Sequence, residues 1–416
     1  MTASAVLVTG GSGYLGGFLV CHFAASGCHV GLTYHSNPPP SLPRNAQAFQ
    51  VDLATGAGLD ACLAGLTAGG RQLFAVINCA AISQPAACKM NPAGAEAVNV
   101  PTKLLDALER WWQRREGELA AAAAEAEEQQ QQAQQQEQQQ SQQADFAQQS
   151  KQDNRPGILR LLSRISSGGR GLSRISGGRR GPSPVHGGAS GPDSGSACCS
   201  ADSTQTGAEG GGRDRPPLFV QLSTDQVYDG SRPRWTEGDE PRPVNAYGRS
   251  KLAAERAVAA RWPNHAILRS SLLYGPEPPL GPVDRPLFLQ FIIEQLGKGE
   301  PVDFYEDEWR SPVRVRDVVR VVQTLIARQA GLRHRLFNMG GPERLSRADM
   351  ARAVAKAHGL DAALVRAVPA PPAAQRGVAS PADISMDSSL LETELQLRLT
   401  PLRKALQQML AKGDGE

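Results

Sequence analysis

The feature that most constrains the fold is a glycine-rich turn directly after the first strand-like run. Residues 5–9 (AVLVT) form a short apolar run, and a helical pattern begins at Tyr14. Between them, Gly11, Gly13 and Gly16 have the spacing G-x-G-x-x-G. The first glycines permit a tight turn and a close approach to a pyrophosphate, and Gly16 lets the helix pack against the strand. Because the free N–H groups at a helix start attract anions, we predict a dinucleotide site here.

Strand-like and helix-like segments alternate through the rest of the N-terminal region. Further strands are predicted at 29–34, 48–53 and 74–81, and a helix at 95–111. Apolar strands that alternate with helices indicate a parallel sheet covered on both faces. The predicted fold class is therefore α/β, with a Rossmann-type doubly wound sheet and a smaller C-terminal substrate domain.

The composition changes abruptly within the chain. Residues 113–215 hold an Ala/Glu/Gln tract and then Gly, Ser and Arg, which bury too little apolar surface to offset the ordering entropy. We expect a disordered insertion, with some helix in its Gln-rich part. Its Arg/Gly part can contact RNA, but balanced acids and bases favour solvated filler. The Rossmann domain is predicted at 1–112 and 216–275, and 276–416 is expected to be mainly a substrate-binding segment that partly returns to the sheet.

Charge and cysteine content exclude several classes of protein. A formal net charge of +3 provides no strong attraction to nucleic acid or anionic membranes. Seven scattered cysteines fit neither a disulfide framework nor a zinc site, so we predict a reducing compartment and no metal site. Because no apolar run reaches about 18 residues and strand-like sequence begins near the first residue, we expect a cytoplasmic protein without a membrane span.

The end of the second predicted strand discriminates between the two dinucleotides. An NAD site usually has an acid there for the ribose 2′-hydroxyl, and none lies between Thr33 and Arg44. With His35 and Ser36 nearby, this favours NADP(H) over NAD(H), although the same residues can form an ordinary polar loop. Asp52 is placed to accept from the adenine amino group, or equally to cap the turn that follows.

Tyr247 and Lys251 lie one helical turn apart at the start of an alanine-rich helix. Reduction of a carbonyl needs a hydride and a proton, and a tyrosine hydroxyl can supply the proton although its usual pKa of about 10 is high. A lysine on the same helix face favours the phenolate and can hold the nicotinamide ribose. Ser223 and Thr224 end the strand at 218–224, at the sheet edge where ligands bind. The alternative is a pair of surface residues on a solvated helix.

These motifs together resemble the extended short-chain dehydrogenase/reductase superfamily. The glycine motif, NCAA at 78–81, VNV at 98–100 and YGRSK at 247–251 all match its pattern. More narrowly, STDQVYDG, ILRSSLLYG and DEWRSPVRVRDVV look like the dTDP-4-dehydrorhamnose reductases and the related regulatory β subunits of methionine adenosyltransferase. The resemblance extends over nearly all residues outside the insertion.

The resemblance implies site roles for matching residues. It makes Thr224 the catalytic Ser/Thr, Tyr247 the acid and Lys251 its partner. Asn99 matches the superfamily's helix asparagine, or is a polar residue on an exposed helix face. The resulting set of expected cofactor-binding residues is Gly10, Gly11, Ser12, Gly13, Tyr14, Leu15, Gly16, His35, Ser36, Asp52, Leu53, Cys79, Ala80, Ala81, Asn99, Tyr247 and Lys251.

Two further residues are candidates for substrate binding. Ser223 precedes the predicted catalytic threonine. Arg310 lies in a motif of the substrate segment, and its guanidinium suits phosphate oxygens. Arg310 can equally pair with an acid such as Asp307 or Glu308.

Two functions stay open at this point. The first is an NADP(H)-dependent reductase that acts on the 4-keto group of a nucleotide-linked deoxysugar, which the retained Thr, Tyr and Lys favour. The second is an NADP-binding regulatory subunit that associates with the catalytic methionine adenosyltransferase subunit in S-adenosylmethionine biosynthesis. The segment CAAISQPAACKMNPAGAEAVNV (79–100) looks more like that subunit. The sequence leaves both a monomer and a homodimer open.

Overall fold

The structure is a computed structural model that describes residues 4–153, 215–283 and 287–411. The chain divides into two units. One consists of Met1–Arg114 together with Thr206–Glu416, and the other of Arg115–Gln205. The predicted site residues all belong to the first unit.

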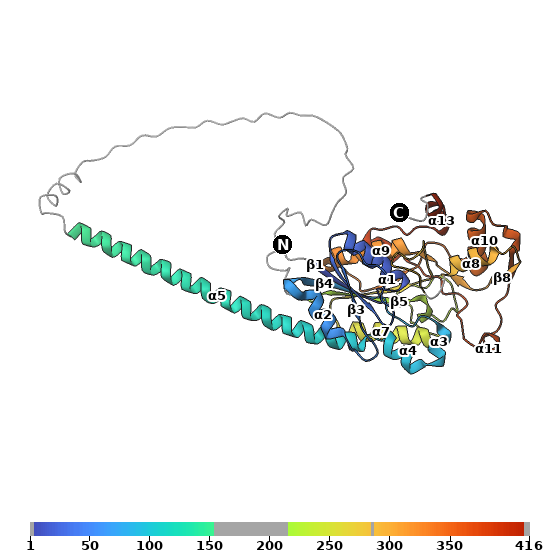
Figure 1. Cartoon of the computed structure of the whole chain (residues 1–416), viewed down its shortest axis with the longest axis horizontal. Helices are drawn as coiled ribbons and strands as arrows, with labels where there is room; N and C mark the ends of the chain where they lie inside the picture. Colours follow the sequence, from blue (N-terminus) through green and yellow to red (C-terminus); the bar gives the residue numbers. More distant parts are fainter. Residues whose placement is uncertain (1–3, 154–214, 284–286, 412–416) are drawn as a thin grey trace, which may run out of the picture. The chain divides into compact units, whose positions relative to one another are not determined.

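A seven-stranded parallel sheet forms the centre of the first unit (Figure 1). Its strand order is β11-β6-β5-β4-β1-β2-β3, so the order reverses between β1 and β4. This is the doubly wound arrangement in which ligands bind beyond the carboxyl ends of the strands at the reversal point. The predicted α/β fold class is therefore confirmed. The strands are β1 (Ser4–Thr9), β2 (His29–Tyr34), β3 (Ala46–Gln50), β4 (Gln72–Asn78), β5 (Leu218–Thr224), β6 (His265–Ser270) and β11 (Leu336–Met339).

Helices cover both faces of the sheet, as the near-continuous apolar strands require. In β1, Val6 and Val8 join one hydrophobic core, whereas Ala5 and Leu7 join the other. The first core contains residues of α1, α9 and α12, and the second contains residues of α2, α7 and the start of α5. These helices are α1 (Tyr14–Ala25), α2 (Leu59–Thr67), α5 (Thr102–Asp153), α7 (Ala246–Arg261), α9 (Val315–Arg328) and α12 (Ser389–Leu395).

A third hydrophobic core belongs to the C-terminal part of the chain. Apolar residues of α8, α10 and α13 pack there with β8 and β13, which pair in parallel as a separate two-stranded sheet. The predicted C-terminal segment thus has a core of its own within the first unit. Its elements are α8 (Phe288–Leu296), β8 (Val302–Tyr305), α10 (Arg347–His358), β13 (Val365–Val368) and α13 (Leu402–Ala411).

Short elements connect these layers. They are η1 (Ala68–Gly70), α3 (Pro85–Met90), α4 (Pro92–Asn99), η2 (Asp225–Val227), β7 (Leu273–Tyr274), β9 (Trp309–Arg310), β10 (Val313–Arg314), η3 (Gln329–Gly331), β12 (Leu345–Ser346), η4 (Ala362–Leu364) and α11 (Ala373–Arg376).

The single helix predicted at 95–111 is wrong. The structure has α4 and α5 instead, separated at Val100 and Pro101. Val100 is extended, with φ −88° and ψ 115°. The cause is local, because the proline ring disfavours helical backbone at the preceding residue and removes an N–H donor.

The long helix α5 also tests the prediction for the insertion. The insertion at 113–215 is predicted to hold some helix in its Gln-rich part, and α5 confirms this with a helix that continues to Asp153. Between 115 and 149 its residues are almost all exposed, so the Ala/Glu/Gln composition and not burial accounts for the helix. The predicted disorder of 154–214 lies outside the described residues. In the described part of the chain, neither α5 nor any other helix is long and apolar enough to cross a membrane.

Candidate active site

Ten of the predicted site residues line one cavity of about 420 Å³. The cavity lies at the start of α1 and beyond the carboxyl ends of β4 and β5, where a doubly wound sheet binds its ligands. The predicted residues that line it are Gly13, Tyr14, Leu15, Cys79, Ala81, Ser223, Thr224, Tyr247, Lys251 and Arg310.

The glycine turn before α1 needs its glycines for two different reasons. Gly10 has φ +64°, a conformation that L side chains rarely adopt. At Gly16, an added Cβ would lie 2.2 Å from the carbonyl oxygen of Gly10. The helix therefore packs directly against the turn that precedes it, and the N–H of Gly13 donates to the same Gly10 oxygen at 3.0 Å.

The start of α1 has the character of an anion site. Its N-cap, Gly13, provides no side-chain hydrogen bond, and no acid lies in the first turn. The end of β2 holds the turn in place, because Gly10 N donates to Thr33 Oγ1 at 3.1 Å and Gly11 N donates to Thr33 O at 3.0 Å. An uncapped helix start keeps its N–H donors and positive dipole end available for a phosphate.

The residues predicted to bind the adenosine end lie beside this turn but do not line the cavity. His35 Nδ1 and Ser36 Oγ are 2.8 Å apart on the exposed loop after β2. Asp52 caps the turn after β3, because it accepts from Ala54 N at 2.9 Å and from Thr55 Oγ1 at 2.9 Å. Those bonds lower the pKa of Asp52. The turn-capping alternative thus describes Asp52 in this structure.

The helix α7 brings Tyr247 to the end of β5 through a close backbone approach. Asn245 caps the helix by accepting from Gly248 N at 2.9 Å, and its amide donates to Gln226 Oε1 at 2.8 Å. A Cβ at Gly248 would lie 2.1 Å from Gln226 O. The glycine after the tyrosine therefore lets α7 lie directly on η2, next to Thr224.

The hydroxyl of Thr224 is held by its neighbours. It donates to Asp225 Oδ1 at 3.1 Å and accepts from Gln226 N at 3.2 Å, which caps η2. Asp225 also accepts from Ser271 Oγ at 2.7 Å. Burial raises the pKa of Asp225, although Arg310 acts in the opposite direction. Asp225 and Ser271 line the cavity and were not predicted from the sequence, even though Asp225 directly follows Thr224.

Tyr247 and Lys251 are buried, not surface residues on a solvated helix. Tyr247 is 9% exposed and Lys251 is 2% exposed. Burial raises the pKa of Tyr247, and a hydrogen bond with Thr224 partly opposes this. Burial lowers the pKa of Lys251 to about 8, although the nearby carboxylate of Glu255 opposes this. Lys251 is therefore mainly charged near neutral pH, and the phenol of Tyr247 is protonated.

Asn99 does not line the cavity, but it joins the loop after β4 to α7. It is fully buried, which contradicts the alternative of an exposed helix face. Its Oδ1 accepts from Ile82 N at 2.7 Å, and its Nδ2 donates to Ile82 O at 3.1 Å and to Ser250 Oγ at 2.8 Å. Ser250 Oγ in turn donates to Tyr247 O at 2.8 Å. Asn99 thus fixes the loop after β4 against α7.

The two substrate candidates are both engaged in other contacts. The hydroxyl of Ser223 donates to Glu255, which forms a buried ion pair with Arg269 at 2.7 Å. Arg310 is 3.6 Å from the carboxylate of Glu308 and donates to Trp309 O at 2.7 Å. The ion-pair alternative with Glu308 therefore describes Arg310, although its side chain also lines the cavity.

A second cavity-lining arginine was not predicted. Arg347, at the start of α10, lies 3.7 Å from Glu308 Oε2, and its guanidinium is 4.7 Å from the centre of the Phe288 ring. Burial lowers the pKa of Arg347 to about 10, and the charge of Arg310 adds to this effect. Local sequence patterns could not predict Arg347 as a site residue, because it lies about 100 residues along the chain from Tyr247 in α7.

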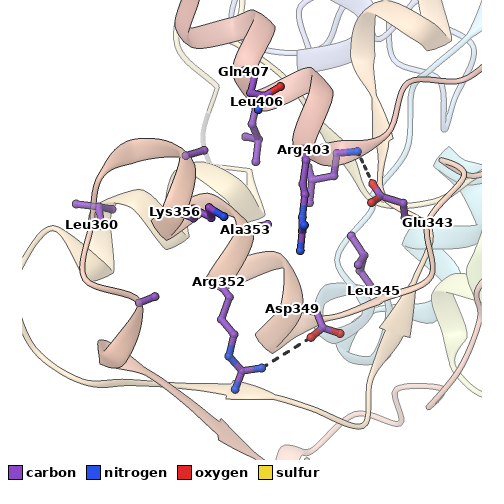
Figure 2. A pocket seen from close by; sticks show the side chains of 13 residues that line it. Glu343, Leu345, Asp349, Arg352, Ala353, Lys356, Leu360, Arg403, Leu406 and Gln407 are labelled. Atoms are coloured by element: carbon purple, nitrogen blue, oxygen red, sulfur yellow. Dashed lines mark hydrogen bonds and ion pairs between the residues drawn. The ribbon is translucent and has the colours of Figure 1, made fainter.

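Size alone does not identify the site. A cavity of about 920 Å³ lies between α10 and α13 and contains none of the predicted residues (Figure 2). Its apolar lining includes Leu345, Leu360 and Leu406, and Arg352 is paired with Asp349 at its rim. No tyrosine or threonine among the described residues lines it, unlike the smaller cavity, where both meet a lysine.

Two family models match the chain. The RmlD substrate binding domain matches residues 209–414, and the NAD dependent epimerase/dehydratase family matches residues 6–144. Between them they cover most of the chain, and the first includes Thr224, Tyr247 and Lys251.

The chain is similar in sequence to several curated proteins, among them the two that follow. Methionine adenosyltransferase 2 subunit beta of Mus musculus is 31% identical over 197 residues, which are 46% of this chain and 57% of the relative. The dTDP-4-dehydrorhamnose reductase of Mycobacterium tuberculosis is 32% identical over 192 residues, which are 44% of this chain and 59% of the relative. The chain thus spans less than two-thirds of the length of either relative.

Solved structures share the fold at low sequence identity. A dTDP-4-dehydrorhamnose reductase from Bacillus anthracis in complex with NADP aligns with a TM-score of 0.60 and 15% identity over 99% of both chains. UDP-glucose 4-epimerase from Thermus thermophilus in complex with NAD aligns with a TM-score of 0.61 and 17% identity over 97% of this chain and 96% of that one. The family matches and this shared fold together make the chain similar to members of the extended short-chain dehydrogenase/reductase superfamily.

Proposed function

We propose that this protein is an NADP(H)-dependent reductase that reduces the 4-keto group of a nucleotide-linked deoxysugar. The observation that carries the proposal is the meeting of Thr224, Tyr247 and Lys251 in one cavity with the uncapped start of α1. The similarity to a mycobacterial dTDP-4-dehydrorhamnose reductase supports the choice of substrate class. The fold shared with a reductase that was solved with NADP supports the choice of cofactor.

The residues around α1 fit a dinucleotide. A Cβ at Gly10 or Gly16 would strike backbone atoms, so both positions of the turn require glycine, as the dinucleotide-binding motif does. The N–H groups of Tyr14, Leu15 and Gly16 at the helix start would hold the phosphates. The exposed loop with His35 and Ser36 lacks an acid, which supports NADP(H) over NAD(H).

The buried phenol accounts for proton delivery in this proposal. When bound, the nicotinamide supplies the hydride. Tyr247 keeps its proton near neutral pH because burial raises its pKa, and it gives up that proton to the developing alkoxide. Thr224 lies beside Tyr247 and orients the carbonyl oxygen. The ammonium of Lys251, charged below about pH 8, holds the nicotinamide ribose and favours the phenolate as it forms.

The other end of the cavity suits an anionic substrate. Arg310 and Arg347 line it, and the nearby Glu308 is shared with a third arginine, Arg376, which donates to it. Burial alone would raise the pKa of Glu308, but the three arginines together hold it below its usual value. The cluster therefore retains positive charge for the diphosphate of a nucleotide sugar.

A second function has one specific observation in its favour. The mouse methionine adenosyltransferase 2 subunit beta matches the chain as well as the mycobacterial reductase does. The alternative is that this protein binds NADP(H) in the same cavity and regulates a catalytic methionine adenosyltransferase subunit. In that case Tyr247 and Lys251 would hold the cofactor without transferring a proton. A cytoplasmic location and a homodimer stay predictions under either function.

The deciding experiment measures NADPH oxidation with dTDP-4-dehydrorhamnose for the wild type and for Tyr247→Phe. We expect Tyr247→Phe to lower turnover by roughly 10²–10⁴-fold, the usual contribution of a proton donor, with nearly unchanged NADPH affinity. Tyr305→Phe is the matched control, since Tyr305 lies in β8 outside the cavity. Unchanged turnover in Tyr247→Phe would refute its role. A wild type that binds NADPH without turnover, and stimulates methionine adenosyltransferase, would establish the regulatory function.

A further inference from the structure

A strongly basic cavity lies on the other side of α13 from the cavity of Figure 2. It has a volume of about 610 Å³ and is formed by β10, the first turns of α9, the segment after α12 and α13. Among the residues that the structure describes, its single lining acid is Asp317. The lining cations are Arg314, Arg316, Arg320, Arg398 and Lys404.

Asp317 does not neutralise this set of cations. It is buried and accepts from Thr400 N at 2.7 Å and from Thr400 Oγ1 at 3.1 Å. Arg320 is its ion-pair partner at 3.3 Å. Its carboxylate therefore anchors the segment before α13 and balances one arginine only. Of the other cations, Arg398 pairs with Glu392 at 2.7 Å, but its own side chain is 87% exposed, so this pair is weak.

Arg314 lines the cavity, and one of its hydrogen-bond donors has no partner among the described residues. Its Nη1 donates to Gln408 Oε1 at 2.6 Å, but its buried Nε has no hydrogen-bond partner among the described residues. Burial lowers the pKa of Arg314, and the charges of Arg316 and Arg320 lower it further, although Asp317 opposes them. Because the neighbouring cations destabilise the charged form of Arg314, an anion that binds between them would stabilise it.

We propose that this basic cavity binds a small molecule that carries two or more linked phosphate groups. Because five cations line the cavity, linked phosphates suit it better than one monovalent anion does, since they present several oxygens to the guanidinium groups. The volume suits a ligand of that size and exceeds what a single small ion fills. No residue that lines this cavity lines the proposed cofactor cavity. The inference is therefore independent of the proposed reductase function.

The test is isothermal titration calorimetry of the full chain with inorganic tripolyphosphate in the presence of saturating NADP, which keeps the start of α1 occupied. The test variant is Arg316→Gln with Lys404→Gln, since both side chains are exposed and line the basic cavity. The matched control is Arg352→Gln with Lys356→Gln, which removes the same charge from the cavity of Figure 2. Thermal melts confirm that all variants fold.

We expect wild type to bind tripolyphosphate and to bind inorganic phosphate at least ten times more weakly. The test variant should raise the tripolyphosphate Kd about tenfold or more, and the control should leave it within about twofold, because two charge-assisted contacts are lost in one case and none in the other. Equal losses in the two double variants would mean a general charge effect and would overturn the proposal. So would the absence of binding to wild type, or equal affinity for phosphate and tripolyphosphate.

Discussion

Replacing Gly16 by alanine tests whether the turn before α1 is built by backbone packing, as the structure indicates. The new Cβ would lie 2.2 Å from Gly10 O and 2.7 Å from Gly11 Cα. The neighbouring Gly17 is in the same helix, yet a Cβ there would meet Leu280 Cγ at 3.5 Å, an ordinary van der Waals contact. The two substitutions are chemically identical and one residue apart, so they form a matched pair.

The expected magnitudes follow from these contacts. A carbon–oxygen contact of 2.2 Å must open by roughly 1 Å to become acceptable, and the atoms that have to move are backbone atoms. Overpacking of this kind costs about 1–3 kcal/mol, offset by up to about 1 kcal/mol of better helix propensity. Gly17→Ala gains the propensity without the clash. We therefore expect Gly16→Ala to be less stable than Gly17→Ala by about 2 kcal/mol.

Two measurements check this reasoning. Urea denaturation gives the free energies of unfolding, and NADPH fluorescence titration gives the affinities. Because the clash displaces the donors of the turn, Gly16→Ala should also weaken NADPH binding by about tenfold or more, equivalent to one lost hydrogen bond to a charged group. If Gly16→Ala unfolds and binds NADPH like Gly17→Ala, the close packing of helix on turn is not what the site requires.

Three other predictions concern Lys251 and Asn99. Burial lowers the pKa of Lys251 to about 8 from its ordinary 10.5, so NADPH affinity should fall as the pH rises through about 8. Lys251→Met should abolish that pH dependence. A wild-type NADPH affinity that stays unchanged from pH 7 to 9 would contradict the role of the ammonium. The same shift means that the unfolded chain binds more protons between those two values, so this residue should increase the free energy of unfolding as the pH rises from 8 to 10.5. Asn99→Ala should lower the free energy of unfolding in urea by about 1–3 kcal/mol, since it leaves the N–H of Ile82 without its partner. The exposed Asn45→Ala, as a control, should change it by less than about 0.5 kcal/mol, and equal losses in the two variants would refute the bridging role of Asn99.

Features that depend on near neighbours in the chain could be read from the sequence. The apolar run of β1, the glycine turn and the start of α1 are contiguous, and their spacing alone predicts their conformation. The break between α4 and α5 was missed although Pro101 signals it locally. Helix in the Gln-rich part of the insertion could be predicted, but its continuous extent to Asp153 could not, because an exposed helix has no buried face that marks its end.

The surroundings of individual polar residues could not be predicted. Asn99 was equally compatible with an exposed helix face, and only the packing of α4 against α7 buries it. From the sequence, the hydroxyl of Ser223 could bind a substrate. In the fold it donates to Glu255 instead. Arg347 lies in a segment whose sequence has no motif that marks it as a binding residue. Each of these depends on a contact between residues far apart in the chain.

The sequence by itself determined the doubly wound α/β class and the one-turn spacing of Tyr247 and Lys251. Both follow from periodicity and local backbone geometry, which act within a few residues. Only the tertiary structure decided that this pair is buried beside Thr224, and that Arg310 and Arg347 border the same cavity. Burial and charge proximity arise from long-range packing, and they set the pKa values on which the proposed chemistry depends.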